Sequence, residues 1–185
     1  SSAEAIWEGH WDDRAQTFDE AHFIDGFGHP DGKFHFAPDW SKIGGNHHGM
    51  PRLPDHDANI DNRDDDHPFR LVTAPSRNYL NTSFTETATS QLREGRPEAQ
   101  IHSDICTELG LEAGGLVRIG NAQGSVVVHV RPTAGMRRGT VIVESVWPNR
   151  SFIEGIGINL LISADAGRPN GGAVFHDTAV WLGNA

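Results

Sequence analysis

The sequence predicts a mainly β domain, a compact β-barrel with small helices, preceded by a largely irregular acidic leader. About seven short apolar segments, separated by turn signals, lie after residue 68, which is typical of a barrel. One short helix pattern lies among them, and the first 67 residues are poor in apolar side chains. A chain of 185 residues is long enough for one ordinary domain with such an appendage.

The boundary between leader and barrel is expected near His67-Pro68, where charge and hydrophobicity change together. Residues 1–67 hold 15 acidic and 5 basic side chains, whereas residues 68–185 hold 10 of each, so the leader accounts for the whole net charge of −10. We therefore divide the chain into a leader, 1–67, and a barrel, 68–185. The balanced charge of the barrel argues against a nucleic-acid binder, which usually carries a basic stripe.

A single cysteine, Cys106, limits the chemistry that this chain can supply alone. A disulfide framework or a thiolate metal cluster needs several cysteines, so both are excluded. The longest apolar run is too short to span a bilayer, and the acidic N-terminus lacks the features of a signal peptide. We expect a soluble, cytoplasmic protein that binds neither nucleic acid nor a membrane, with Cys106 buried as a small hydrophobe.

The leader contains two weak patterns of secondary structure. The segment Asp13–Ile24 predicts a short amphipathic helix. His29–Phe36 predicts a Pro-Asp-Gly turn that leads into one half-buried strand through Phe34 and Phe36. Residues 38–68 are rich in Pro, Gly and Asp, so we expect them to form an extended connector on a surface.

Histidines and aspartates in the leader raise the hypothesis of a metal site, because imidazole and carboxylate groups are common metal ligands. The run that starts at Asp55 does not match an EF-hand, since Ile60 stands where that loop needs Gly and no Glu occupies its twelfth position. The adjacent His47 and His48 point apart in an extended chain. We therefore expect a solvated acidic linker and no metal site.

The barrel segment predicts a regular order of short elements. A hairpin should turn at Asn121–Gly124, and Ser103 should cap a helix that stops at Gly110 in the left-handed conformation. Val126, Val128 and Val130, with Ile142, Val143 and Val146, should form the core, while Val127 faces the other way. The predicted strands are 69–73, 99–101, 116–119, 125–130, 140–146, 173–175 and 178–182, and the predicted helical segments are 88–93 and 104–109.

The order of these elements resembles a known family. Residues 101–128 combine a strand, a Ser-Asp helix, Leu-Gly-Leu-Glu-Ala-Gly-Gly, a strand and Asn-x-x-Gly. They resemble the central signature of the molybdopterin-dinucleotide-binding domain that ends the dimethyl sulfoxide reductase and formate dehydrogenase type of molybdenum and tungsten oxidoreductases. Residues 71–84 resemble that domain's opening strand and cofactor loop, residues 157–163 its late Gly-x-Asn-x-Leu turn, and residues 30–36 the Pro-x-Gly-Lys/Arg segment that precedes it.

This resemblance implies a double-psi β-barrel and a cofactor, a molybdenum or tungsten ion held by two molybdopterin guanine dinucleotides. The family's chains are several times longer, and their upstream domains supply the metal ligand. The chain is thus expected to be the C-terminal cofactor-binding domain of an oxidoreductase of the formate dehydrogenase-like or S-/N-oxide reductase-like type. Its leader would pack on upstream domains or a catalytic subunit of the same enzyme, and the cofactor would bind only together with them.

Candidate cofactor ligands follow from the resemblance and from polar residues on predicted loops, where binding residues concentrate. Arg77 is expected on a phosphate, Asn78 and Asn81 on ribose or base edges, and Asn159, as a buried amide, on the pterin or its linker. From the residues alone, a solvated connection explains the loop from Ser76 to Ser83 better than a binding loop does, and a structural turn explains Asn159 equally well. The full set is Thr73, Ser76, Arg77, Asn78, Asn81, Thr82, Ser83, Trp147, Asn149, Asn159, His176 and Asp177, with no catalytic or metal-ligating residue in this chain.

Three other functional classes need to be weighed against the main hypothesis. Gly124-Ser125 is similar to the self-cleaving Gly-Ser of pyruvoyl decarboxylases, which share the double-psi barrel, but here Ser125 begins a valine-rich hairpin strand. A serine hydrolase is disfavoured because no Gly-x-Ser-x-Gly occurs. A non-catalytic barrel that docks onto a larger subunit through its acidic leader stays open, and co-purified pterin or guanine nucleotide would separate it from the main hypothesis.

Overall fold

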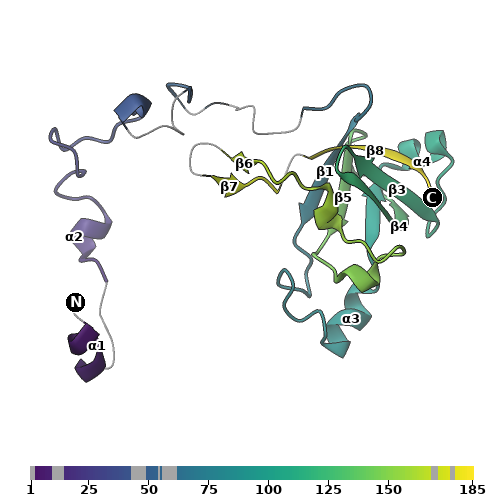
Figure 1. Ribbon diagram of the computed structural model, residues 1–185, viewed down its shortest axis with the longest axis horizontal. Helices are drawn as coiled ribbons and strands as arrows, with labels where there is room; N and C mark the ends of the chain where they lie inside the picture. Colours follow the sequence, from purple (N-terminus) through teal and green to yellow (C-terminus); the bar gives the residue numbers. More distant parts are fainter. Residues whose placement is uncertain are drawn as a thin grey trace.

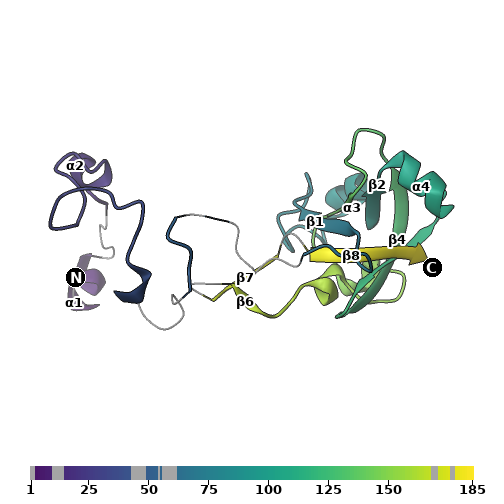
Figure 2. The ribbon, with the colours of Figure 1, turned by 90° about the horizontal axis from the view of Figure 1, so that it is seen from above.

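A computed structural model describes residues 3–9, 15–42, 49–53, 55, 62–167, 171–175 and 178–185. A barrel forms one end of the molecule, and the described parts of the leader extend away from it (Figures 1 and 2). The described residues of the leader form two short helices and a 3-10 turn, α1 (Ala3–Gly9), α2 (Phe18–Ala21) and η1 (Trp40–Lys42), and none of them joins a strand of the barrel.

Six strands close the barrel in the order β1 (Phe69–Ala74), β5 (Thr140–Glu144), β2 (Glu98–Ile101), β4 (Gly124–Pro132), β3 (Leu116–Asn121) and β8 (Thr178–Asn184). The pairs β1/β5 and β2/β4 are parallel, and the other four pairs are antiparallel. The mainly β fold class with a closed barrel is confirmed. The predicted strand 173–175 is wrong in its bounds, because β7 (Gly172–Ala173) pairs with the unpredicted β6 (Ala166–Gly167) in a ribbon outside the barrel.

The core confirms the predicted face of β4 and corrects that of β5. Val126, Val128 and Val130 are buried as predicted, but in β5 the buried residues are Val141 and Val143, while Ile142 is only half-buried. Val143 is therefore confirmed as a core residue, Ile142 is not, and Val141 was missed, because successive side chains point to opposite faces of a strand. Val127 is 2 % exposed and thus also buried, because η4 (Ile158–Leu161) packs on β4.

β5 ends at Glu144, so Val146 lies outside it and is half-buried. The strand cannot continue because Ser145 has φ +71°, which lies outside the extended region. Trp147 follows and is buried against Tyr79, with a distance of 5.0 Å between the ring centroids.

Both helices of the barrel domain, α3 (Ala88–Glu94) and α4 (Ser103–Leu109), form where the sequence predicts them. The capping residue of α4 is His102 rather than Ser103, because the His102 Nδ1 accepts a 3.1 Å hydrogen bond from the backbone N–H of Asp104. Gly110 ends α4 in the left-handed conformation, as predicted. Cys106 is buried within the helix, as expected, and burial raises the pKa of its thiol.

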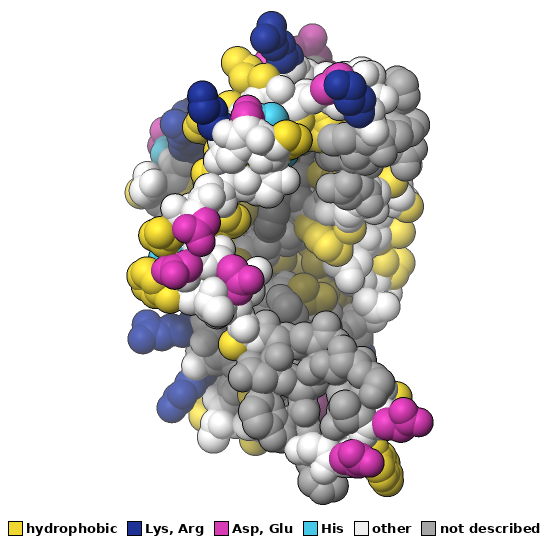
Figure 3. All heavy atoms as spheres, turned by 90° about the vertical axis from the view of Figure 1, so that its left-hand side faces the viewer, with side chains coloured by type: hydrophobic (Ala, Val, Ile, Leu, Met, Phe, Trp, Pro, Cys, Tyr) yellow, Lys and Arg dark blue, Asp and Glu magenta, His cyan; other side chains and the backbone are white. Residues whose placement is uncertain are grey.

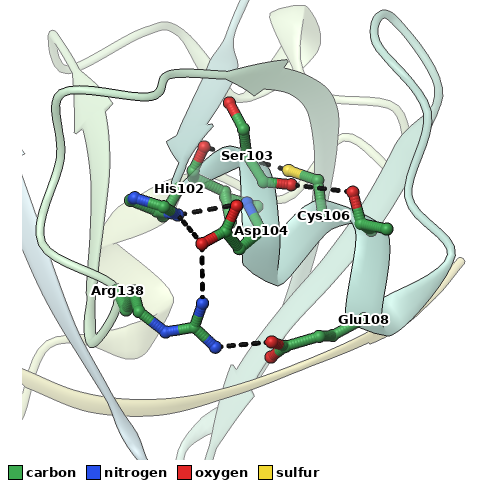
Figure 4. Close-up of polar contacts among 8 residues, drawn as sticks. His102, Ser103, Asp104, Cys106, Glu108 and Arg138 are labelled. Atoms are coloured by element: carbon green, nitrogen blue, oxygen red, sulfur yellow. Dashed lines mark hydrogen bonds and ion pairs between the residues drawn. The ribbon is translucent and has the colours of Figure 1, made fainter.

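Arg138 ties the loop before β5 to α4. Its guanidinium lies 2.9 Å from an Asp104 carboxylate oxygen and 2.5 Å from one of Glu108 (Figure 4). The two carboxylates stand one helical turn apart, so one arginine can bridge them.

The hairpin of β3 and β4 turns at Ala122-Gln123, as predicted, and Gly120 in β3 lies opposite Trp181 in β8. A Cβ placed on Gly120 would lie only 2.2 Å from the Trp181 Cζ2. The indole therefore occupies the space that any other side chain would need. This contact lies within the pair β3/β8, one of the two pairs through which β8 closes the barrel.

The leader departs more from prediction. Of the predicted helix Asp13–Ile24, residues 13 and 14 lie outside the described residues, and among residues 15–24 only Phe18–Ala21 is helical, as α2, where Thr17 and Glu20 form a capping box. The turn before Lys33 is present, but Phe34 and Phe36 lie in no strand, because no neighbouring strand among the described residues pairs with them. His47, His48 and residues 56–61 lie outside the described residues.

Metal-binding clusters and membrane-spanning helices are absent from the part of the chain that the structure describes. None of these residues forms a group of three or more His, Cys, Asp or Glu placed to hold a metal ion. Within the same ranges, no helix has the length and apolar character needed to cross a membrane.

Candidate functional site

The candidate site lies where two neighbouring parallel strands end. β1 and β5 run side by side to the pair Ala74 and Glu144, and the Ser145 N–H then donates to the Ala74 carbonyl at 2.8 Å. The loops after both strands therefore begin at the same end of the barrel. A cavity of about 460 Å³ lies here, lined by Thr73, Ala74, Pro75, Ser76, Asn81, Ser145, Val146, Asn159 and Phe175.

The loop after β1 is anchored by one aromatic side chain and one carboxylate. Tyr79 is buried against Trp147, and burial raises the pKa of its hydroxyl. Asn78 donates both its backbone N–H and its side-chain amide to Glu94 Oε1, each at 2.6 Å. These contacts fix the conformation in which the rest of the loop reaches the cavity.

The tip of this loop is a tight turn that carries Asn81. Leu80 and Ser83 exchange backbone hydrogen bonds of 3.2 and 2.8 Å on either side of it. Asn81 has φ +50°, a left-handed conformation that Asn tolerates better than most residues. The turn thus places an amide on the cavity wall with a defined backbone.

Asn159 reaches the same cavity from η4. Its neighbours Ile158 and Leu161 are buried, and the Asn121 side-chain amide donates to the Leu161 carbonyl at 2.8 Å. Leu160 also lies close to Gly124 in the hairpin. Asn159 itself is exposed, so the expectation of a buried amide that must find a partner is wrong, and its side chain is free to meet a ligand.

Ser145 is the site residue that the sequence did not reveal. It is only 4 % exposed, its Oγ has no hydrogen-bond partner among the described residues, and its φ is +71°. A buried hydroxyl without a partner costs about 1–3 kcal/mol, and a left-handed backbone at a residue other than Gly costs a similar amount. The only sequence feature that could have pointed to Ser145 was its position as a polar residue near the end of an apolar strand.

The structure brings together four of the predicted ligands, Thr73, Ser76, Asn81 and Asn159, on one cavity. The others lie elsewhere for identifiable reasons: Asn78 is held by Glu94, and Trp147 is part of the core. His176 and Asp177 lie outside the described residues. The predicted residues that are exposed and do not line the cavity are Arg77, Thr82, Ser83 and Asn149.

The described side chains on the cavity wall are uncharged. Hydroxyl and amide groups both donate and accept hydrogen bonds, and Pro75, Val146 and Phe175 add apolar surface. These three were not predicted, because the sequence signal for a binding site was its polar groups. A cavity of this size with a few convergent polar groups suits a neutral ring system or sugar.

Comparison with known proteins gives a consistent result. The family described as "Molydopterin dinucleotide binding domain" matches residues 69–179. A Bacillus subtilis protein named as an oxidoreductase, YoaE, is 25% identical over 134 residues, which cover 72% of this chain and 19% of that protein. A Halobacterium salinarum protein named as the catalytic subunit of a dimethyl sulfoxide reductase is 27% identical over 116 residues, 63% of this chain and 14% of that protein.

A solved structure shares the fold. Acetylene hydratase from Pelobacter acetylenicus superposes with a TM-score of 0.66 and 16% identity, over 86% of this chain and 24% of that one. The chain therefore spans about a quarter or less of the length of each of these proteins.

Proposed function

The chain belongs to the molybdopterin dinucleotide binding domain family, and from that premise we propose that its barrel holds part of the cofactor of a molybdopterin-dependent oxidoreductase. One observation carries the proposal: the cavity at the ends of β1 and β5 gathers hydroxyl and amide groups from three segments far apart in the sequence. The names of the two relatives support an oxidoreductase context.

The residues of the cavity fit such a cofactor. Thr73 and Ser76 offer hydroxyls, and Asn81 and Asn159 offer amides, on the cavity wall. These groups would bind and orient the organic part of the cofactor, while the apolar wall would exclude water. The cofactor, when bound, supplies the redox chemistry.

The finer assignment is a bis-guanine dinucleotide cofactor with molybdenum or tungsten, on a double-psi barrel. The two parallel pairs, β1/β5 and β2/β4, support that barrel type. The reaction would be of the formate dehydrogenase-like or S-/N-oxide reductase-like type, and the name of the Halobacterium relative favours the second.

The leader is proposed to dock on the remainder of the same enzyme. Phe23, Phe27, Phe34 and Phe36 form an aromatic row in which neighbouring rings lie 4.7–5.3 Å apart. Phe34 and Phe36 also line an apolar hollow of about 520 Å³ with Trp40. On the face of the molecule that Figure 3 shows, hydrophobic side chains are exposed at several places. Exposed aromatic side chains that gather in this way favour an interface, in which aromatic residues are enriched.

The test is cofactor retention in the enzyme that contains this domain. Asn81→Gly, which keeps the left-handed backbone without strain, and Asn159→Ala should each lower the pterin extracted per protein, roughly tenfold if one hydrogen bond of ordinary strength limits binding, without changing thermal unfolding of the barrel. Gln123→Ala removes an exposed amide in the hairpin turn, away from the cavity wall, and is the matched control. Full pterin content in both variants would overturn the assignment. Wild-type enzyme without pterin would instead favour the non-catalytic docking module.

A further inference from the structure

The chain between β1 and β2 presents apolar side chains to solvent. Leu80, Phe84 and Leu92 are 65 %, 61 % and 86 % exposed, which makes them the three most exposed large hydrophobic side chains among the described residues of the barrel. We call residues 80–92, which contain all three, the outer segment. Single exposed apolar residues are ordinary, but three within one short segment favour an interaction surface.

Phe84 also has an unfavourable backbone. Its φ of +69° lies in the left-handed region that bulky residues avoid. The surrounding loop holds it there, because the Phe84 carbonyl accepts from the Thr87 N–H at 3.0 Å and the buried Thr85 hydroxyl donates to the Thr82 carbonyl at 3.0 Å. The ring is thus presented outward in a fixed position, and strain of this kind concentrates at functional surfaces.

α3, which carries Leu92, has no buried side chain. It is attached to the loop by polar contacts: the Gln91 amide donates to the Thr85 carbonyl at 2.7 Å, and Glu94 accepts from Asn78. A helix this short is marginal in water unless other parts of the protein pack on it. The apolar side chain of Leu92 therefore lies on a helix with surface left for a partner.

The outer segment adjoins the candidate cavity. Asn81, which lies between Leu80 and Phe84, is on the cavity wall. In Figure 1 the loop after β1 and α3 lie together beyond the end of β1. A protein part that shares one cofactor with this barrel has to meet the barrel at this end.

We propose that the outer segment is an interface with the remainder of the same enzyme, which covers Leu80, Phe84 and Leu92 with apolar side chains. The inference rests on the proposed cofactor function, which brings that remainder to the mouth of the cavity. The chain spans only 14% to 24% of the length of the relatives that it matches, so most of such a protein is available to form the other side. The exposed Arg93 beside Leu92 favours an acidic group there as well.

Hydroxyl-radical labelling read by mass spectrometry compares the 185-residue chain with the complete enzyme. Leu80, Phe84 and Leu92 should be labelled readily in the chain and should lose most of that labelling in the enzyme, because the radical reaches only exposed side chains. Leu109 is the internal reference, since it is exposed on α4, away from α3 (Figure 1). The proposal fails if the outer segment is labelled equally in both proteins, or is protected no better than Leu109.

Phe84→Gly separates an interface from a requirement of the barrel itself, because the two roles predict opposite signs. In the isolated chain it should raise the melting temperature by roughly 2–4 °C, since glycine adopts a left-handed backbone without strain. In the complete enzyme it should increase the labelling of Leu92, because a covering contact is lost. A lower melting temperature of the chain, or unchanged labelling of Leu92 in the enzyme, would overturn the proposal.

Two controls identify the occupant. Leu109→Ala removes an exposed side chain from the other helix and should leave the labelling of the outer segment unchanged. Sedimentation of the isolated chain should show a monomer. A dimer that Leu92→Asp dissociates would assign the outer segment to a second copy of the chain and would overturn the proposal.

Pterin content distinguishes failure of this interface from failure of the cofactor function. Enzyme that contains pterin while its outer segment stays fully labelled keeps the function and removes the interface. Enzyme that lacks pterin while its outer segment is protected removes the function and keeps the covered surface.

Discussion

The valines of the barrel and the phenylalanines of the leader have opposite environments. Val117, Val126, Val141 and Val143 are fully buried. By contrast, the side chain of Phe36 is 75 % exposed, and Phe18, Phe23 and Phe34 are each more than half exposed. Apolar burial is the main favourable term in folding, so the barrel is stabilised by its own residues, whereas the described leader gains little from its exposed phenylalanines; we propose that a partner covers them.

Charge divides the chain in the same way. The barrel is balanced, while the leader carries the net charge of −10. A surface that is both acidic and aromatic fits a partner with basic and apolar side chains. One chain can thus combine a self-sufficient domain with a segment that depends on its surroundings.

A charge in the barrel core should have the largest effect. Val128→Asp would bury a carboxylate without a partner, at a cost of several kcal/mol, which is comparable with the whole stability of an ordinary domain. Circular dichroism should show an unfolded barrel. Phe36→Asp is the control in the leader and should leave the unfolding transition unchanged; equal destabilisation by both substitutions would remove the contrast between the regions.

Closure of the barrel at β8 is the next test. Gly120→Ala would place a methyl group inside the Trp181 indole, and overpacking of this kind costs about 1–3 kcal/mol, measured by urea denaturation. Gly135→Ala, where nothing lies within 4 Å of the added Cβ, should be tolerated. If Gly120→Ala unfolds like wild type, the two strands do not meet in this register.

Removal of the aromatic row should affect the complete enzyme and not the isolated chain. Phe34→Ser with Phe36→Ser should change the unfolding free energy of the chain by less than about 0.5 kcal/mol, because both side chains are exposed. In the complete enzyme the same change should speed proteolysis of the leader. Equal proteolysis rates would show that the row is not covered there.

The smallest effect is expected at the ion pair of Arg118 and Glu154. The guanidinium donates to both carboxylate oxygens, at 2.9 and 2.6 Å, and lowers the pKa of Glu154. The pair therefore adds stability above the unfolded-state pKa of Glu, about 4.3, and that stability is lost as the pH falls through the lower folded value.

Glu154→Gln should accordingly lower the melting temperature slightly at pH 7 and have no effect well below about pH 4. Because both side chains are partly exposed, added salt should reduce the difference. A difference that grows toward acid pH would contradict the pairing.

The sequence predicted the local features that neighbouring residues determine. The turn at Ala122-Gln123, the left-handed Gly110 and the buried face of β4 were all readable, because spacing and glycine positions specify them. The pairing of β3 with β8 could not be predicted from the sequence, because the contact of Gly120 with Trp181 joins segments that are distant in sequence.

The site was predictable in part for the same reason. Asn81 and Asn159 could be found as polar residues in turns, and the family resemblance connected them. Ser145 could not be found from the sequence, because its left-handed backbone and its burial both depend on how β5 ends beside β1. Phe34 and Phe36 alternate as a strand would, but a strand also needs a neighbour.

The central claim, that the cavity at the ends of β1 and β5 holds the cofactor, is tested most directly by an experimental structure of the cofactor-loaded enzyme. We predict cofactor atoms within hydrogen-bond distance, about 2.7–3.2 Å, of the side-chain amides of Asn81 and Asn159. A cofactor that contacts neither of these two groups, or a cavity filled by a side chain of a neighbouring domain, would contradict the claim.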